Sequence, residues 1–404
     1  MTKPKIHFTH EEFADRQNRV RQELVKRELD GLLLFKIEDM YWMTGFDSDG
    51  FCIFHSMFVG ADGQLTHLSR TADLANLHYS SICDDVRIAP DSANVSWASC
   101  IKDMLAAHGM RGKRIGIQVD TMGLTPKVFL EIQASLEGWC ELVIAENFIQ
   151  DQRRVKSPQE LTYIKTAGKI LDEALETALA EVYVGAFEGD IYGAFYNKLF
   201  CLGADLPAHI PPLGCGDSAL NVRYTTGRKH VAKNDQITLE LGLAYRHYHA
   251  GSMCVALTGP NIRDKHLRMH EVLVPTLSTI QDNLRPGKTM GEIYDLYVDL
   301  LSDKGMSDLA QTACGYTMGA VWPPTWMEQP LFYSGNPTVI EKDMTFFNML
   351  ILNDHKAGMI MALGEQVIVT DGPPEVVSHV PKEPVIIDPS NLPESASPSG
   401  PLTT

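Results

Sequence analysis

The sequence predicts two folded domains, an α/β domain over residues 1–152 and an α+β domain over residues 153–380. The second is expected to have pseudo-two-fold symmetry, with a curved antiparallel sheet backed by helices. Three observations lead to this prediction: a length of 404 residues, which exceeds what one hydrophobic core usually organises, alternating strand-like and helix-like segments in the first part, and an internal repeat in the second. Residues 381–404 are rich in Pro and Ser, so we expect a flexible tail there.

A helix is expected to open the first domain. Thr9 and Glu12 form a capping-box pattern, and the amphipathic helical period continues to Leu29. The apolar run Leu32–Phe35 follows and is typical of a buried strand. Strand-like and helix-like segments then alternate to about Ile149, which predicts an α/β domain.

The second domain is expected to begin with a long helix. Ser157 can cap this helix, and Pro158 suits its first position. The helical period runs from Glu160 to Val182, and a second helix is predicted over residues 190–202.

One segment of the second domain occurs twice. Residues 185–192 (GAFEGDIY) return as residues 287–294 (GKTMGEIY). Each copy joins two helices and precedes a pair of strands, at Gln236–Thr258 and at Met344–Thr370. Two such units predict a pseudo-two-fold domain, and a cleft between its halves would collect residues from both.

Composition and charge argue against several classes of partner. The net charge of −16, with no Lys- or Arg-rich stripe, disfavours nucleic acid. The apolar stretches are too short to span a membrane, and Met1–Lys5 lacks the apolar core of a secretory signal. The eight cysteines include no CxxC pair, as is typical of free thiols in a reducing compartment. We therefore expect a cytoplasmic protein that acts on a small molecule.

These features resemble the superfamily of creatinase, prolidase and methionine aminopeptidase, which has the pita-bread fold, over about residues 9–375. The resemblance rests on the small first domain, the Lys156–Glu160 helix start and the duplicated halves. Within the superfamily the chain is most similar to ectoine hydrolases, through Phe8–Phe13, Tyr248-His249, Gly315–Gly319 and Trp322–Trp326. The resemblance implies a homodimeric hydrolase of a non-peptide C–N bond, such as that of a cyclic amidine, in a small amino-acid-like substrate.

The metal site of the superfamily is expected to be lost in this chain. Metal-dependent members bind two ions through two Asp, one His and two Glu. The resemblance places these positions on Glu240, Gly251 or its neighbour, Tyr316, Met349 and Gly364. One carboxylate offers too few anionic oxygens for two hard cations. We therefore expect no catalytic metal and no cofactor.

Three residues are candidates for catalysis: Glu240, His249 and Glu365. Glu240 lies in an apolar strand, where an unpaired carboxylate would cost several kcal/mol, so a partner such as Arg246 or Arg223 is expected to tune it. The resemblance implies that His249, at the ectoine hydrolase position, is the general base. Glu365 can hydrogen-bond the leaving amine, and the alternative is a surface charge on an edge strand.

Four residues of the second domain are candidates for substrate binding. The resemblance places Arg223 where creatinase-like members carry a His base. A guanidinium cannot accept a proton at neutral pH, but it can hold a carboxylate in bidentate fashion. Tyr316, Trp322 and Trp326 surround a Pro-Pro turn, where their rings either stack on a flat or cationic ligand or fill core space.

Two further residues are implied by the resemblance alone. Phe51 and His55 match a segment that, in creatinase relatives, reaches across the dimer to cover the partner's cleft. Met253 and Cys254 stand where creatinase carries Glu and Arg, so creatine is not the expected substrate. The same fold also supports lyases and non-catalytic binding modules, and both stay open as alternatives.

Overall fold

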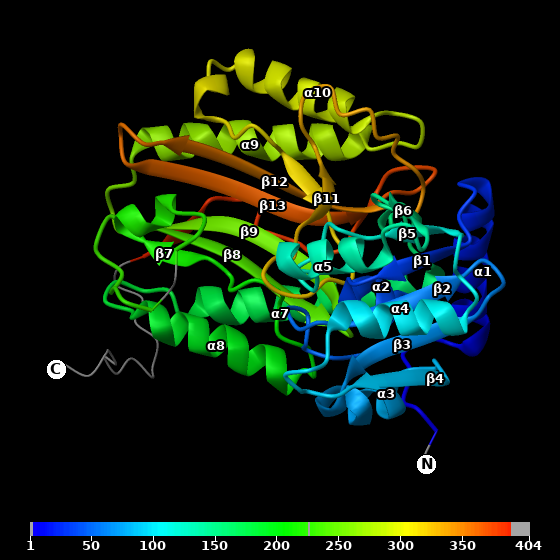
Figure 1. Cartoon of the computed structure of the whole chain (residues 1–404). Helices are drawn as coiled ribbons and strands as arrows, with labels where there is room; N and C mark the ends of the chain where they lie inside the picture. The colour runs from blue at the N-terminus through cyan, green and yellow to red at the C-terminus, as the bar shows by residue number, and fades with distance from the viewer. Residues whose placement is uncertain (1–2, 225–226, 389–404) are drawn as a thin grey trace. The chain divides into compact units, whose positions relative to one another are not determined.

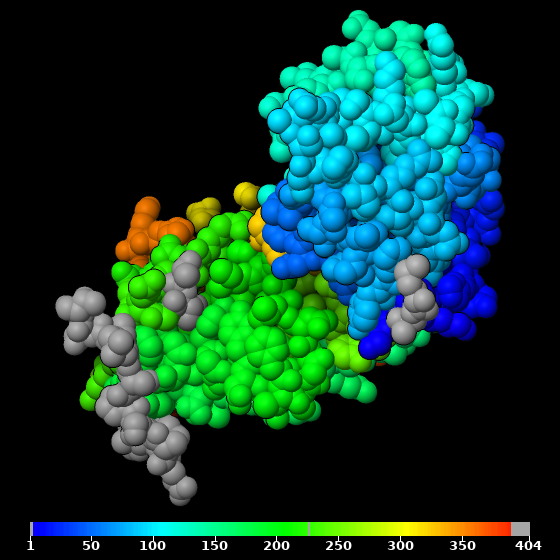
Figure 2. All heavy atoms as spheres, turned by 60° about the horizontal axis from the view of Figure 1, so that its bottom comes forward, coloured from blue at the N-terminus to red at the C-terminus, as the bar shows by residue number. Residues whose placement is uncertain are grey.

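The computed structural model describes residues 3–224 and 227–388, which form two compact units, Met1–Arg153 and Arg154–Thr404. In Figures 1 and 2 the first unit runs from blue to cyan and the second from green to red. The α/β and α+β composition of the two units confirms the predicted fold class. Within the described ranges, no helix is long and apolar enough to cross a membrane.

The first unit is a six-stranded mixed sheet with helices, in the strand order β4-β3-β2-β1-β5-β6. Its strands are β1 (Gly31–Leu34), β2 (Ser56–Gly60), β3 (Leu65–Arg70), β4 (Asp85–Ala89), β5 (Arg114–Ile117) and β6 (Glu141–Ile144). Its helices are α1 (His10–Lys26), α2 (Ile37–Thr44), η1 (Thr71–Asp73), α3 (Leu74–Ser80), α4 (Trp97–Ala107), α5 (Pro126–Leu136) and α6 (Gln150–Arg153). Thr9 caps α1 as predicted, because its side chain accepts the backbone N–H of Glu12.

The second unit is a nine-stranded sheet that is antiparallel except for the parallel pairing of β15 with β9, with the order β11-β10-β12-β13-β9-β8-β7 along its main path. Its strands are β7 (Leu213–Cys215), β8 (Gln236–Tyr245), β9 (Tyr248–Thr258), β10 (Gly315–Thr317), β11 (Glu328–Leu331), β12 (Thr345–Asp354), β13 (Met359–Ile368), β14 (Glu375–Val376) and β15 (Val385–Ile387). Its helices are α7 (Pro158–Ala180), α8 (Glu188–Cys201), η2 (Gly216–Leu220), α9 (Asp264–Asn283), α10 (Met290–Ser302) and η3 (Ser307–Leu309).

The predicted duplication is visible in the arrangement of these elements. Helix α7 packs on the hairpin β8–β9 and α8 packs on α7, whereas α9 packs on the hairpin β12–β13 and α10 packs on α9 (Figure 1). Complete capping boxes start α7 at Ser157 and α10 at Thr289. The long strands are buried along nearly their whole length, which makes the sheet the centre of the core.

The C-terminal segment differs from the prediction. We expected residues 381–404 to form a flexible tail, but β15 pairs in parallel with β9, and Lys382 forms an ion pair with Glu365. The backbone of β9 supplies the hydrogen bonds and the buried Glu365 supplies the attraction, and neither can be recognised from the local composition. The prediction was wrong for residues 381–388, whereas residues 389–404 lie outside the described part.

Candidate functional site

The register of the sheet gathers one set of side chains on a single face around Glu240. Glu240 on β8 lies opposite Met253 on β9, Met253 lies opposite Gly364 on β13, and Gly364 lies opposite Met349 on β12. Side chains that are directly opposed across antiparallel strands point to the same face. The positions to which the resemblance assigns the metal ligands of the superfamily therefore share one face in this chain, and Glu240 is the carboxylate among them.

Glu240 has the electrostatic environment of an acid–base group. Its side chain is buried, and this burial raises its pKa to about 7, although the positive charge of Arg223 acts in the opposite direction. Of the two expected partners, Arg223 is the one whose charge acts on the pKa of Glu240. The Nη1 of Arg246 donates to the Tyr163 hydroxyl at 2.9 Å. A carboxyl with a pKa near 7 both takes up and releases a proton at neutral pH.

Aromatic side chains build the wall of this face. Tyr316 on β10 lies opposite Phe347, two residues from Met349, and so joins the same face. Trp326 donates its Nε1–H to the Tyr316 hydroxyl at 2.8 Å, and both rings are buried. Burial and the nearby Glu240 charge hold the pKa of Tyr316 well above its usual range, so Tyr316 stays a neutral hydroxyl.

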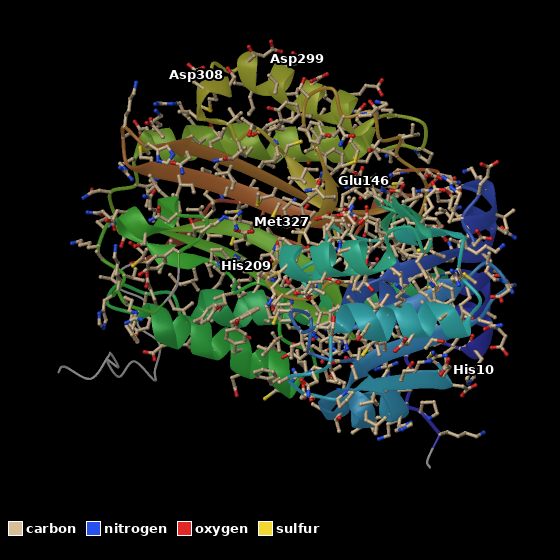
Figure 3. All side chains as sticks on the ribbon, viewed as in Figure 1. His10, Glu146, His209, Asp299, Asp308 and Met327 are labelled. Carbon is tan, nitrogen blue, oxygen red and sulfur yellow. The ribbon has the colours of Figure 1, made fainter. Side chains whose placement is uncertain are left out.

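His209 is a functional candidate that the sequence did not reveal. His209 is labelled in Figure 3 and precedes β7 in the chain. Its ring meets the Trp326 ring edge to face, with 5.3 Å between the ring centroids. Its Nδ1 lies 3.2 Å from the carbonyl oxygen of Pro324, so the proton belongs on Nδ1 and the lone pair on Nε2. Burial, aided by the Arg223 charge, lowers the pKa of His209 and keeps the ring neutral.

The contact of His209 with the site could not be predicted from the sequence, because it joins segments that are far apart along the chain. The hydrogen bond to Pro324 spans 115 positions, and residues 208–212 show no helical or strand periodicity. A His in an irregular segment gives no local signal of its partners. The Pro-Pro turn at Pro324, which the sequence did single out, was the one available hint.

His249 has a different environment from the one predicted for a general base. Its Nε2 accepts the backbone N–H of Ala208 at 2.8 Å, and its Nδ1 lies 2.8 Å from the carbonyl oxygen of His247. Burial lowers its pKa to about 4, which keeps the ring neutral. With both nitrogens bonded to backbone, His249 has no free lone pair for a proton from water. This geometry favours a structural role, in which His249 fixes the segment that carries His209.

We expect His249→Leu to lower the free energy of unfolding by about 3 kcal/mol, because it leaves a buried N–H and a buried carbonyl without partners. Urea denaturation of the variant and the wild-type protein measures this loss. A variant of unchanged stability whose kcat has fallen 100-fold would instead restore His249 as the base.

Glu365 lies on the opposite face of the sheet from Glu240. It follows Gly364 directly in β13, so its side chain points toward α9, where it accepts a hydrogen bond from the Gln281 amide at 3.3 Å. Lys382 lies 2.6 Å from its Oε1, and the N–H of Val380 donates to the same atom. Because β13 lies in the interior of the sheet, the surface-charge alternative does not apply either. Glu365 therefore joins the C-terminal segment to the sheet and does not belong to the Glu240 face.

The remaining candidates have partners of their own. Trp322 stacks on His247 at 3.9 Å between centroids, at the turn between β8 and β9. In the first unit, His55 is buried, and its Nδ1 lies 2.9 Å from the Ser69 hydroxyl. His55 is therefore enclosed within its own unit, whereas Phe51 is half-buried, and its contact with a partner's cleft stays a prediction.

The donors on the Glu240 face do not fit the two-metal site that the resemblance describes. A Cβ at Gly364 would lie 2.7 Å from the ring of Phe347, and one at Gly251 would lie 3.0 Å from the methyl of Met318. Carboxylates at these positions would require the Phe347 ring or the Met318 side chain to move. Across residues 3–224 and 227–388, no group of three or more His, Cys, Asp or Glu side chains is placed to hold a metal ion. Hard cations need several anionic oxygens, and this face provides one carboxylate.

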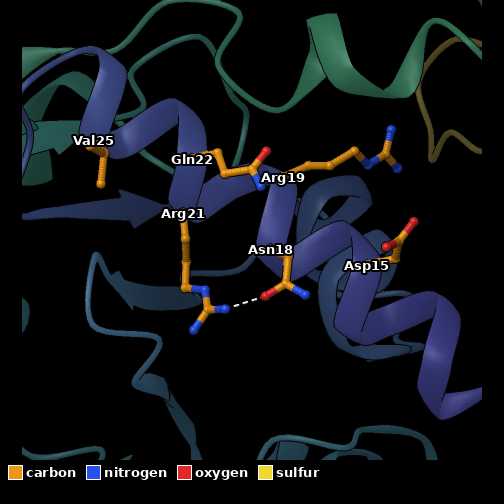
Figure 4. A pocket seen from close by; sticks show the side chains of 6 residues that line it. All are labelled: Asp15, Asn18, Arg19, Arg21, Gln22 and Val25. Atoms are coloured by element: carbon orange, nitrogen blue, oxygen red, sulfur yellow. Dashed lines mark hydrogen bonds between the residues drawn. The ribbon is translucent and has the colours of Figure 1, made fainter.

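A surface hollow of the first unit is not a competing site. It lies along α1, and Asp15, Asn18, Arg19, Arg21, Gln22 and Val25 line it (Figure 4). All six belong to one helix, and Arg21 already donates a hydrogen bond to Asn18. No second element encloses a ligand there.

Comparison with known proteins agrees with this architecture. Residues 162–371 match the model of metallopeptidase family M24, and residues 16–155 match the creatinase/prolidase N-terminal domain. The ectoine hydrolase of Halomonas elongata is 25% identical, with 95% of this chain and 99% of that protein covered. The Xaa-Pro dipeptidase of Pyrococcus horikoshii is 21% identical, with coverage of 74% and 80%. The dipeptidase structure from Mycobacterium ulcerans has a TM-score of 0.82 at 19% identity, with coverage of 94% and 99%. These findings confirm the predicted superfamily and fold.

Proposed function

Because the chain belongs to metallopeptidase family M24, we propose that it is a hydrolase of that family that cleaves a non-peptide C–N bond in a small amino-acid-like substrate. The substrate class we propose is a cyclic amidine that carries a carboxylate, of which ectoine is the example. The observation that supports this most directly is Glu240, a buried carboxyl with a pKa of about 7 beside Arg223. The similarity to an ectoine hydrolase over nearly the whole chain supports the choice of substrate.

In this proposal the substrate carboxylate binds to Arg223. The guanidinium is exposed, and its charge influences the pKa values of Glu240, Tyr316 and His209, so it lies where a ligand at this face would meet it. Arginine holds carboxylates in bidentate fashion, which orients the rest of the ligand toward Glu240. The hydroxyl of Tyr316 and the ring of Trp326 form the wall against the ligand.

The proposed chemistry is a proton-coupled addition of water. Glu240, as the carboxylate, takes a proton from water while the oxygen attacks the amidine carbon. The protonated Glu240, directly or through a water near His209 Nε2 that relays the proton, then protonates the departing ring nitrogen as the C–N bond breaks. The products are an amide and a free amine, and the water supplies both the oxygen and the two hydrogens. No metal takes part in this scheme.

Turnover of ectoine to N-acetyl-diaminobutyrate tests the proposal directly. We expect Glu240→Gln to lower kcat by about 10²- to 10⁴-fold, the usual contribution of a general base. Arg223→Ala should raise KM for the carboxylate substrate, whereas Glu292→Gln, at an exposed helix cap, should change neither constant. Proton NMR follows the ring opening, and elemental analysis of the active protein with a chelation control tests the metal. Stoichiometric iron, manganese or zinc with loss of activity on chelation would refute the metal-free scheme.

Two other reactions are distinguished by the same assays. Cleavage of an Xaa-Pro dipeptide with no action on ectoine would place the chain with the dipeptidases among its relatives. A product without oxygen from ¹⁸O-labelled water would indicate elimination by a lyase.

We also propose that the enzyme works as a homodimer in the cytoplasm. All eight cysteines are free, which suits a reducing compartment. Light scattering of the purified chain, whose monomer mass is 44.9 kDa, tests the dimer.

A further inference from the structure

Glu188 is a fully buried carboxylate that the proposed mechanism does not use. It is the first residue of α8 and belongs to the repeated segment GAFEGDIY. Its Oε1 accepts the backbone N–H of Cys215 at 2.9 Å, and its Oε2 accepts three consecutive backbone N–H groups, those of residues 227–229, at 3.1–3.2 Å. The Tyr224 hydroxyl also donates to Oε2 at 3.2 Å. These five donors form an anion-binding site, and the anion in it is the Glu188 carboxylate of the protein itself.

The repeat provides an internal comparison for this position. The two copies align Glu188 with Met290, the first residue of α10, and both side chains are 0% exposed. An apolar side chain therefore serves at the same place in the second half, so the fold does not require a carboxylate at this helix start. Burying a charge costs several kcal/mol unless it is compensated, so the carboxylate of the first half has a local purpose.

The Glu188 carboxylate holds the segment that contains Arg223. Tyr224 directly follows Arg223, and residues 227–229 lie further along the same segment, so Glu188 is bonded on both sides of residues 225–226. Within the described part of the chain, the guanidinium of Arg223 has no hydrogen-bond acceptor that would fix it. The backbone of this segment therefore helps to set where the guanidinium lies, and Glu188 anchors this backbone on both sides.

We propose that Glu188 is a positioning residue, which anchors the segment around Arg223 and so directs the guanidinium into the site. That Arg223 binds a substrate carboxylate rests on the proposed function, whereas the action of the Arg223 charge on Glu240 does not. The role is specific to the first half of the repeat, where Glu188 replaces the apolar residue of its twin.

A double-mutant cycle between Glu188→Gln and Arg223→Ala tests the proposal. With ectoine as substrate, Glu188→Gln is expected to raise KM about tenfold or more, the scale of one charge-assisted hydrogen bond, with a smaller change in kcat. The double variant should be no worse than Arg223→Ala alone, because both changes remove the same interaction. Fully additive effects would refute the positioning role.

A second readout needs no substrate. The Arg223 charge lowers the pKa of Glu240 in the wild-type protein. Carbon-13 NMR of labelled Glu carboxyls, assigned with Glu240→Gln, should therefore show a higher pKa in Arg223→Ala and in Glu188→Gln alike. An unchanged pKa in Glu188→Gln overturns the inference. A raised pKa in both variants without turnover of any tested substrate overturns the proposed function and leaves the inference standing.

Two further variants guard against misfolding. Tyr224→Phe removes one of the five hydrogen bonds without burying a new group, and should shift KM and the pKa in the same directions by less than Glu188→Gln does. Glu292→Gln removes a carboxylate from the start of the twin helix α10, where it accepts the backbone N–H of the N-cap residue Thr289. This control should change neither KM nor the pKa of Glu240. If Glu292→Gln reproduced the effects of Glu188→Gln, the effects would come from helix stability and the inference would fail.

Discussion

Glu240→Gln is expected to make the protein more stable above pH 7 by about 3 kcal/mol, while it removes activity. The folded-state pKa of Glu240 is about 7, against a usual value of 4.5. Between these two pH values the folded protein keeps a proton that the unfolded chain has released, so the stability of the wild-type protein falls as pH rises from 4.5 to 7. The difference between the two pKa values corresponds to about 3 kcal/mol, and Gln avoids this cost.

Urea unfolding at several pH values between 4 and 9 measures the effect. The curves of free energy against pH for the two proteins should lie close together near pH 4.5 and separate up to pH 7, with the variant above. Parallel curves would show that Glu240 has an ordinary pKa in the folded state. The same pKa predicts that kcat/KM rises with pH to a plateau above about pH 7, because the base must be deprotonated.

His67 is expected to make the first unit sensitive to acid. Its ring is fully buried against Phe46, at 4.5 Å between centroids, and neither ring nitrogen has a hydrogen-bond partner among the described residues. Burial, aided by the charge of His55, lowers its pKa to about 3. As pH falls from 6.5 to 3, the unfolded chain takes up a proton that the folded state rejects, so stability is lost over this window, by up to roughly 5 kcal/mol.

His67→Leu should remove most of this loss. The wild-type protein should unfold at lower urea concentration as pH is lowered from 7 to 4, and the variant should respond much less. His78→Leu, at an exposed position of the same unit, is the matched control and should follow the wild-type protein. An identical acid response of wild type and His67→Leu would contradict the prediction.

The sequence predicted the elements whose signals are local. Thr9 and Ser157 cap their helices through contacts to residues three positions away, and the repeat marked the two halves of the second unit. Glu240 could be selected because a carboxylate in an apolar strand is anomalous by itself. The family resemblance, in turn, singled out Met253, Met349 and Gly364, which are its neighbours across the sheet.

The sequence could not predict contacts that depend on register or on distant segments. A shift of one residue along β13 separates Gly364 from Glu365 and moves the side chain to the other face of the sheet. The hydrogen bonds of His249 to the backbone of Ala208 and His247 have no sequence signature, so only the resemblance was available to assign its role. The donors that surround Glu188 come from segments 27 to 41 positions away, so its role too appears only in the folded chain.

The packing around Gly251 and Gly364 has a consequence for how this protein can evolve. A carboxylate side chain at either position would require Phe347 or Met318 to move, because a Cβ at Gly364 lies 2.7 Å from Phe347 and one at Gly251 lies 3.0 Å from Met318. Tyr316, at the position of the His ligand, is committed to its bond with Trp326, whose ring also occupies the space beside Gly242. Carboxylates at Gly251 and Gly364 would therefore each need a compensating change in a neighbouring side chain. The identity of these two glycines is in this way tied to that of Met318 and Phe347.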